Sequence, residues 1–191
     1  MRSIGFAVLF FALAACAYEP TVHSDYDRAA DFSHYRTFGF EPRLGTDQAG
    51  YSSLTTQRVK AAVTREMTAR GYTYAENNPD LLVNFSGRRQ SKVDVYNAPA
   101  PMGYYGYRRG LYGPWPGYGM TTDVDQYIEG TLNIDIIDGA HKQMVWEGVA
   151  VGRVPDEGVS EETLNKVVTE IFAKYPFRSG GGASPSAGMG T

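Results

Sequence analysis

Five carboxylates lie close together in the second half of the chain and could perform acid–base or metal chemistry. They are Asp123, Asp125, Glu129, Asp135 and Asp138. Most glycoside hydrolases use two carboxylates that flank the scissile bond. Residues at positions i and i+2 of a strand share a face, so Asp123 and Asp125 could also contact one cation. Acidic residues on the outer face of a strand are usually only solvated, and we predict that none of the five is catalytic.

The other residue types that carry chemistry are sparse. The chain has one cysteine and three histidines, His23, His34 and His141, and these histidines have neither i, i+4 spacing nor a cysteine nearby. No zinc site is predicted on that basis. The sequence also lacks a Gly-x-Ser-x-Gly nucleophile elbow and a P-loop. We therefore predict a protein that is not an enzyme and that binds no metal and no cofactor.

The strongest candidate for a binding surface is the segment 97–120, which is rich in Gly, Tyr and Pro. Its glycines disfavour a helix and its prolines disfavour a central strand, so we predict a loop insertion. Tyr and Trp side chains stack on sugars or lie at membrane interfaces, and arginines pair with phosphates or carboxylates. The candidate contacts, including two arginines before the loop, are Arg88, Arg89, Arg108, Arg109, Tyr104, Tyr105, Tyr107, Tyr112, Trp115 and Tyr118.

The charge distribution sets this segment apart. Between Gly87 and Met120 there are five basic residues and one acidic residue, whereas the whole chain has a net charge of −3. The acidic balance of the chain argues against nucleic acid as a partner. Three interpretations of the loop stay open: a solvated hairpin tip, a self-association segment, and an arm that binds an envelope protein, a lipid headgroup or peptidoglycan.

The only cysteine, Cys16, follows an apolar run. Residues 4–15 are all apolar or small, and this run is shorter than the about 20 residues that a membrane-spanning helix needs. It is typical of a signal peptide. The residues Leu13-Ala14-Ala15-Cys16 resemble the lipobox of bacterial lipoproteins. The resemblance implies that residues 1–15 are removed and that Cys16 receives fatty-acid chains such as palmitate. The next residue is Ala17 rather than aspartate, which by the same resemblance implies the outer membrane.

The elements that must position these residues can be read from hydrophobic spacing. Apolar residues at i, i+3 and i+4 predict one helix that Ser52 or Ser53 caps and that ends at Gly71, and another between Ser160 and Pro176. We expect strands over residues 22–27, 37–40, 81–96, 122–138 and 143–153. This order, β-β-α-β-β-β-α, predicts an α+β fold with a mainly antiparallel β-sheet and both helices on one face.

Domain limits and side-chain faces follow from the same patterns. Residues 16–178 are expected to form a single domain, and residues 179–191, which are mainly Gly, Ser, Ala and Pro, are expected to be a disordered tail. In the last strand, Val145 and Val149 alternate with Trp146, which predicts that Trp146 covers the exposed face of the sheet.

Four segments, taken in order, resemble domain-of-unknown-function family 4136. The segments are 25–27 with 31–38, then 78–83, then 129–138, then 145–148. The resemblance extends from Tyr18 to Phe177. The family consists largely of bacterial envelope lipoproteins and has no established activity, so the resemblance implies no catalytic residue. It implies a non-enzymatic outer-membrane lipoprotein with a periplasmic domain, acting as a binding or accessory module in cell-envelope assembly or maintenance. A periplasmic hydrolase of cell-wall glycan is the alternative.

Overall fold

The computed structural model describes residues 19–47, 52–99 and 120–181. The elements, in chain order, are β1 (Thr21–Tyr26), β2 (Thr37–Phe40), α1 (Leu54–Ala69), β3 (Thr73–Tyr74), β4 (Leu81–Pro99), β5 (Met120–Asp138), β6 (Gln143–Val154) and α3 (Glu161–Ala173). They form one six-stranded sheet in the order β1-β6-β5-β4-β2-β3. Strand β2 runs parallel to β3 and β4, and the remaining pairs are antiparallel. The predicted α+β class is confirmed, with the two-residue strand β3 in addition.

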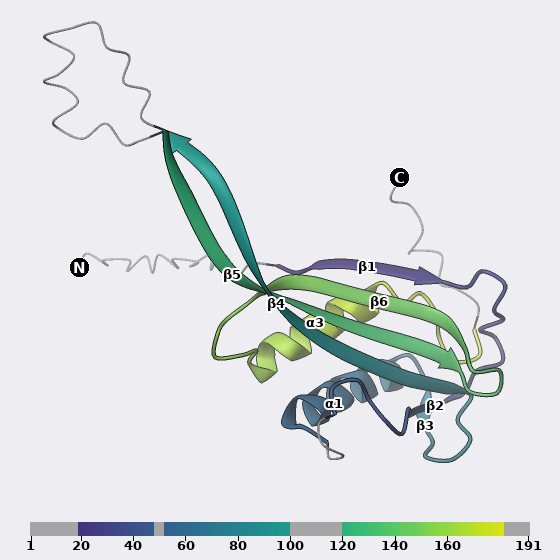
Figure 1. Cartoon of the computed structure of the whole chain (residues 1–191). Coiled ribbons are helices and arrows are strands. Elements are labelled where there is room, and N and C mark those ends of the chain that lie inside the picture. The colour runs from purple at the N-terminus through teal and green to yellow at the C-terminus, as the bar shows by residue number, and fades with distance from the viewer. Residues whose placement is uncertain (1–18, 48–51, 100–119, 182–191) are drawn as a thin grey trace, which may run out of the picture.

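Both helices lie side by side on one face of the sheet (Figure 1). Of the two serines predicted to cap α1, Ser53 is the cap, because its Oγ accepts from the Thr56 N–H at 3.0 Å. Ser160 caps α3 as predicted, because its Oγ accepts from the Thr163 N–H at 3.1 Å. These side chains satisfy amide groups that have no partner within the helix. Gly71, with a φ of 88°, allows the left-handed turn that ends α1.

Strands β4 and β5 pair along their whole length, from Leu81 opposite Asp138 to Pro99 opposite Met120. Strand β6 accompanies β5 only as far as Ile128, which lies opposite Val154. Beyond this point β4 and β5 continue alone as a two-stranded ribbon that projects from the body of the domain (Figure 1). Strand pairing therefore takes in residues 97–99 and 120 of the predicted loop insertion, and residues 100–119 lie outside the described residues.

The position of Trp146 corrects a prediction. The alternation along β6 holds from Trp146 onward, whereas Val145 and Trp146 are both buried. Trp146 is 1% exposed and lies in the core instead of on the outer face of the sheet. It shares its face with Gly148 and Ala150, and a Cβ atom at position 148 would overlap the Trp146 ring. The small residues leave room for the indole under α3. Because Gly148 and Ala150 are small, the sequence pattern gave no sign that this face of β6 is buried. The pattern alone therefore misplaced Trp146.

The described part of the chain extends past the predicted start of the tail. The Ser179 N–H donates to the Arg70 carbonyl at 3.0 Å, and the Gly180 N–H donates to the Tyr35 carbonyl at 3.2 Å. These bonds hold the chain against the domain up to Gly181, where it forms a bridge with Arg178. Residues 182–191 lie outside the described residues.

Candidate functional site

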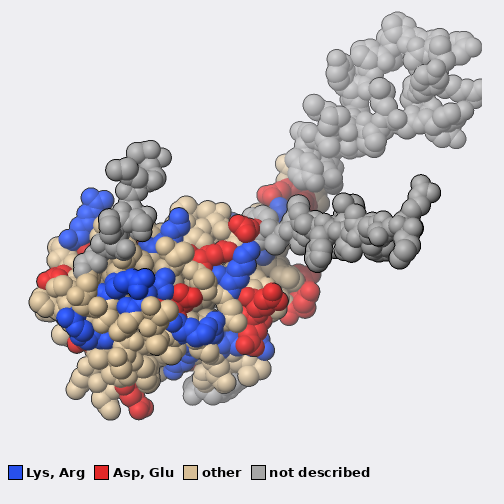
Figure 2. Space-filling view, turned by 180° about the vertical axis from the view of Figure 1, so that it is seen from behind, with Lys and Arg blue, Asp and Glu red and all other residues tan. Residues whose placement is uncertain are grey.

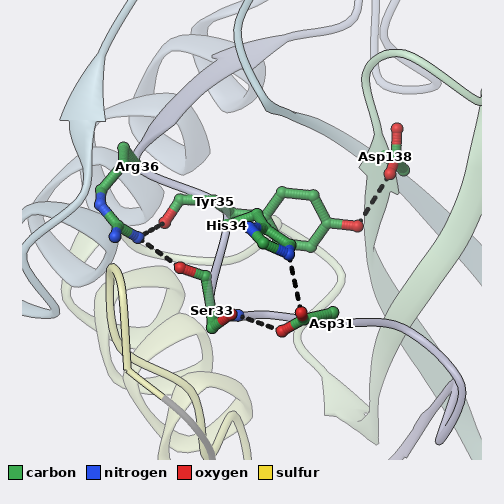
Figure 3. Close-up of polar contacts among 6 residues, drawn as sticks. All are labelled: Asp31, Ser33, His34, Tyr35, Arg36 and Asp138. Carbon is green, nitrogen blue, oxygen red and sulfur yellow. Dashed lines mark hydrogen bonds and ion pairs between the residues drawn. The ribbon is translucent and has the colours of Figure 1, made fainter.

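The first polar cluster lies at the end of the sheet where β4 begins and β5 ends (Figure 3). The Tyr35 hydroxyl donates to Asp138 Oδ2 at 2.8 Å, and Asp138 Oδ1 accepts from the Ala140 and His141 N–H groups at 2.8 Å each. Burial acts to raise the pKa of Asp138, but the bonds from His141, Tyr35 and Ala140 outweigh it and lower the pKa to about 2. Asp138 is thus an ionised acceptor that fixes the β5–β6 turn.

Tyr35 completes this cluster as a structural donor. Burial, followed by the bond to Asp138, raises the pKa of Tyr35 well above its ordinary value. The phenol therefore stays protonated and anchors the segment before β2 to the end of β5. Phe32, Tyr35 and Phe38 are all buried, so these aromatic residues hold the amino-terminal segment on the core.

The carboxylate of Asp80 joins two of the segments that carry the family resemblance. Its Oδ2 atom accepts from the Arg36 N–H, the Thr37 N–H and the Thr37 hydroxyl, each at 2.9 Å. The Asp80 N–H donates in return to Thr37 Oγ1 at 2.9 Å. The two backbone amides that Asp80 binds lie more than forty residues earlier in the chain. The motif residues at this end of the sheet therefore stabilise the fold by binding one another.

The histidines do not come together. His34 lies 2.8 Å from Asp31 (Figure 3). His141 lies 3.0 Å from Asp138, and His23 lies on β1. Over residues 19–47, 52–99 and 120–181, no group of three His, Cys, Asp or Glu side chains is placed to hold a metal ion.

Two of the predicted carboxylates, Asp125 on the ribbon and Glu129 at its base, are paired with basic side chains. Asp125 Oδ2 accepts from Arg153 Nη1 at 2.7 Å, and Asp94 lies 3.4 Å from Arg153 Nη2. Glu129 lies 3.5 Å from the Lys92 ammonium. Asp125 therefore contacts the guanidinium of Arg153. The sequence pattern had allowed it to share a bound cation with Asp123. The side chain of Asp123 lies outside the described residues.

Asp135, one of the five predicted carboxylates, forms a pair with Glu147 that spacing in the sequence does not reveal. They are cross-strand neighbours on β5 and β6. Burial raises the pKa of Asp135, a bond from the Asn84 side-chain amide at 3.2 Å lowers it, and the charge of Glu147 raises it further. Neither residue lines the pocket described below. The pair lies on the open face of the sheet.

A pocket of about 570 Å³ lies at the base of the ribbon, between the sheet and the start of α3. We call it the ribbon-base pocket. Its sheet side presents small residues, Gly87, Gly130, Ala150 and Gly152. Its apolar side chains are Leu132, Val154, Val159, Leu164 and Val167. The pocket arises where the sheet has little side-chain volume, and no periodicity in the sequence pointed to it.

Two of the predicted contact residues, Arg88 and Arg89, line this pocket. Arg89 Nη2 donates to the Pro155 carbonyl at 2.7 Å, which ties the ribbon to the loop before α3. Arg88 is exposed, and its side chain makes no hydrogen bond or ion pair within the described ranges. The remaining candidates lie outside the described residues: Arg108, Arg109, Tyr104, Tyr105, Tyr107, Tyr112, Trp115, Tyr118 and Cys16.

The amino-terminal segment reaches the domain at the same place. Pro20 lines the ribbon-base pocket, and the preceding Glu19 lies 3.0 Å from the ammonium of Lys166 on α3. Strand β1 then runs away from the ribbon, from Thr21 opposite Val151 to Tyr26 opposite Trp146. Any anchor upstream of Pro20 is therefore attached at the ribbon end of the domain.

The surface of the body carries both signs of charge. On the face shown in Figure 2, Lys and Arg side chains are interspersed with Asp and Glu, and neither sign covers the whole face. In the part of the chain that the structure describes, no helix has the length and apolar character needed to cross a membrane.

Comparisons with known proteins agree with this architecture. Residues 22–177 match the family model of a domain of unknown function, DUF4136, and a search of curated proteins finds no match. The fold is similar to that of a DUF4136 family protein from Bacteroides thetaiotaomicron, with a TM-score of 0.53 and 17% identity, covering 85% of this chain and 99% of that chain.

Two other solved structures are similar at lower identity. A PDZ domain protein from Parabacteroides distasonis has a TM-score of 0.54 and 15% identity, covering 85% of this chain and 37% of that one. A minor lipoprotein from Acinetobacter baumannii has a TM-score of 0.39 and 10% identity, covering 74% of this chain and 92% of that chain. Because the family model matches most of the chain, this protein belongs to the DUF4136 family.

Proposed function

We propose that this protein is a non-enzymatic, lipid-anchored protein of the outer membrane whose domain faces the periplasm and binds another envelope component. It would act as an accessory module in envelope assembly or maintenance. The observation that carries the proposal is the position of Pro20 at the ribbon-base pocket. A lipid on Cys16 would hold the ribbon end of the domain against the membrane.

The reach of the tether supports this orientation. Pro20 lies four positions after Cys16, and four extended residues span at most about 14 Å. Strand β4 continues for eight residues beyond Ser91, which lies opposite Ile128, and eight strand residues span about 26 Å. The ribbon is thus longer than the tether and starts from the same end, so an anchored domain brings its ribbon to the membrane surface.

The two faces of the ribbon suit such a surface. Val93 and Val95 are 56% and 64% exposed, and Val124, opposite Val95, is 49% exposed. Cross-strand partners share a face, so these valines form one apolar side. The opposite side carries the charged network around Arg153, whose guanidinium lies 3.9 Å from the centre of the Tyr127 ring. A ribbon with one apolar and one charged side is suited to the boundary between lipid and water.

The glycan hydrolase is the alternative, and Asp135 with Glu147 is its best candidate pair. A raised carboxyl pKa beside a second carboxylate is the arrangement that a general acid needs. A glycosidase must also position the sugar on both sides of the scissile bond, whereas this pair lies on the open sheet face and outside the ribbon-base pocket. We therefore favour the binding module.

A Cys16→Ser variant tests the anchor. We expect it to move from the membrane fraction to the soluble fraction, or to accumulate as unprocessed precursor, because each buried methylene contributes about 0.8 kcal/mol to membrane binding and three acyl chains hold the protein durably. The matched control is Ala17→Asp, which should stay membrane-bound but shift to the inner membrane on a density gradient. A Cys16→Ser protein that is processed normally and still sediments with outer membranes would contradict the proposal.

Deletion of residues 100–119, with an Asn-Gly turn joining β4 to β5, tests the binding arm. We expect the variant to keep the wild-type circular dichroism spectrum, because the core lies elsewhere, but to lose its crosslinked partner in intact cells. The control is Tyr74→Ala, which removes a half-exposed tyrosine from the sheet edge on β3. Wild-type crosslinking by the deletion variant would exclude the segment as the binding arm.

A further inference from the structure

We infer that two copies of this chain pair through β1, in an antiparallel register that sets Ser24 opposite Ser24 and His23 opposite Asp25 of the second copy. The inference goes beyond the proposed function and does not depend on a lipid at Cys16. A lipid would favour the pairing, because it confines both copies to one membrane and raises their effective concentration.

Strand β1 is a sheet edge that is open along its whole length. In the described part of the chain it pairs only with β6, and it lies along the outside of the sheet (Figure 1). Five of its six residues are exposed, and Val22 is half-buried. The other edge strand, β3, has only two residues. Proteins usually protect a long edge with a proline or a bulge, and Thr21–Tyr26 contains neither. This edge is therefore a template for another strand.

The backbone groups that face outward belong to Val22, Ser24 and Tyr26. The Asp27 N–H donates to the Val145 carbonyl on β6 at 2.9 Å. In a strand, residues two apart direct their N–H and C=O groups to the same side. The odd-numbered residues of β1 therefore face β6, and the even-numbered residues can bond a second strand.

One register uses all of these outward groups. With Ser24 opposite Ser24, Val22 lies opposite Tyr26 of the second copy on both sides of the two-fold axis. Each such pair exchanges two backbone hydrogen bonds. The pairing of Val22 with Tyr26 also joins a β-branched side chain to an aromatic ring that is 42% exposed, a combination that stabilises neighbouring strands.

The two neighbouring registers are less favourable. Centring the pair on His23 sets Tyr26 opposite Pro20 of the second copy, and proline has no N–H to donate. Centring the pair on Asp25 sets two aspartates directly opposite each other, and like charges in this position repel. The register centred on Ser24 avoids both costs.

The same register makes His23 and Asp25 reciprocal partners. Val22 packs against the core, so His23 and Asp25 lie on the open face by alternation. They fall in non-hydrogen-bonded pairs, in which cross-strand side chains are closest. An imidazole has an N–H donor in either protonation state. The Asp25 carboxylate accepts from the Tyr26 N–H at 2.8 Å, and it becomes available when that N–H bonds to Val22 of the second copy.

The charges of the open face favour a donor at this position. Asp25 lies opposite Glu147, which lies opposite Asp135 on the next strand. Three carboxyl groups therefore form a row that ends at β1, and the charge of Glu147 contributes to the raised pKa of Asp135. His23 of the second copy would continue this row with a hydrogen-bond donor.

The pairing is compatible with a membrane anchor at the ribbon end. Because the two β1 strands are antiparallel, the two ribbons point in opposite directions along one continuous sheet. A pair that lies along the membrane, with its two-fold axis on the membrane normal, brings both ribbon ends and both anchors to the surface.

The first test is a disulfide at the two-fold axis in full-length protein in isolated outer membranes. Opposite residues of a hydrogen-bonded pair have Cα atoms about 5.5 Å apart, which a disulfide can span. We expect oxidation to convert most of the Ser24→Cys protein to a disulfide-linked dimer on a non-reducing gel. The control is Ser52→Cys, at an exposed position before α1, which should stay monomeric. Equal crosslinking of the two variants would overturn the inference.

A second preparation separates this inference from the proposed function. Cys16 is the only native cysteine, so Ser24→Cys combined with Cys16→Ser has a single thiol and no lipid. The purified protein should also crosslink at high concentration. If Cys16 carries no lipid, the proposed anchor fails and this crosslink remains. If neither preparation crosslinks, the pairing is wrong and the anchor stands.

An exchange of the two side chains tests the register. In the Ser24→Cys protein, His23→Asp should slow crosslinking about tenfold, because it sets a carboxylate opposite Asp25 on both sides of the axis. Adding Asp25→His restores a histidine opposite an aspartate and should return the rate to within about twofold of the starting protein. A double variant that stays as slow as His23→Asp would contradict this register.

A backbone substitution tests the edge itself. Ser24→Pro removes an outward N–H and leaves the bonds to β6 in place, since proline is tolerated on the free side of an edge strand. We expect native mass spectrometry of the detergent-extracted protein to show a monomer for Ser24→Pro and a dimer for its control, Ser24→Ala. Circular dichroism checks that both are folded. Equal dimer fractions in the two folded variants would overturn the inference.

Discussion

Replacement of Trp146 by alanine is expected to lower the free energy of unfolding by about 3 to 5 kcal/mol, the range for removal of a large buried aromatic side chain. The indole is 1% exposed. Its ring stacks on Phe172 of α3 with centroids 6.0 Å apart, and it meets the Tyr175 ring edge-on at 5.1 Å. Loss of these contacts would leave a cavity between β6 and α3, which the backbone cannot close without moving the helix.

Urea unfolding followed by circular dichroism measures this effect, because the substitution itself removes a tryptophan fluorophore. The control is Met144→Ala on the same strand, where the side chain is 47% exposed and the expected loss is within about 1 kcal/mol. If the Trp146→Ala protein unfolds at the same urea concentration as Met144→Ala, then Trp146 does not join the sheet to α3 as described.

Replacement of Asp80 by alanine is expected to cost about 2 to 4 kcal/mol, since hydrogen bonds to a charged acceptor contribute about 1.5 to 3 kcal/mol each and are not additive. The carboxylate holds Arg36 and Thr37 at the start of β2 through three donors. Without it, two backbone N–H groups lose their acceptor. Asp156→Ala is the control, because that exposed side chain makes no hydrogen bond in the described part of the chain.

The same residue makes a prediction about pH. Burial acts to raise the pKa of Asp80, but the bonds from Arg36 and Thr37 outweigh it, so the pKa lies below its ordinary value. The pKa of Asp138 is lowered to about 2. A lowered folded-state pKa contributes stability above the unfolded value of about 3.9, and this contribution is lost as the pH falls toward the folded value.

The wild type should therefore lose stability steadily from about pH 5 to pH 2. The Asp80→Ala protein should show a shallower loss over this range, because one of the two carboxylates is absent. Urea midpoints measured at intervals between pH 7 and pH 2 give the comparison. Parallel curves for the wild type and the variant would mean that contacts in the folded protein do not lower the pKa of Asp80.

The helices and the β5–β6 hairpin could be predicted because their signals are local. Ser53 and Ser160 cap helices whose apolar stripes are complete within one segment, and Asp138-Gly139 marks the turn. Turn chemistry and helix periodicity depend on residues a few positions apart. The adjacency of β4, β5 and β6 also followed, because hairpin-linked strands pair with their neighbours in sequence. The pairing of β1 with β6 and of β2 with β4 joins strands that are distant in the chain and was not predicted.

The features that could not be predicted depend on residues far apart in the chain. The burial of Trp146 depends on the space above Gly148, which α3 closes only in the folded domain. The partners of Asp80 lie on β2. The ribbon-base pocket is bounded by small residues of three strands, Gly87, Gly130 and Gly152, whose alignment requires the register of the sheet. Alternation along one strand shows which side chains share a face but not which face is covered.

The central claim is that a lipid at Cys16 holds the ribbon end of this domain at the membrane. The most direct measurement is mass spectrometry of the amino-terminal peptide of the protein extracted from outer membranes. The account predicts a peptide that begins at Cys16 and carries the mass of a diacylglyceryl group and an amide-linked acyl chain. A peptide that begins elsewhere, or a Cys16 thiol without lipid, would contradict it.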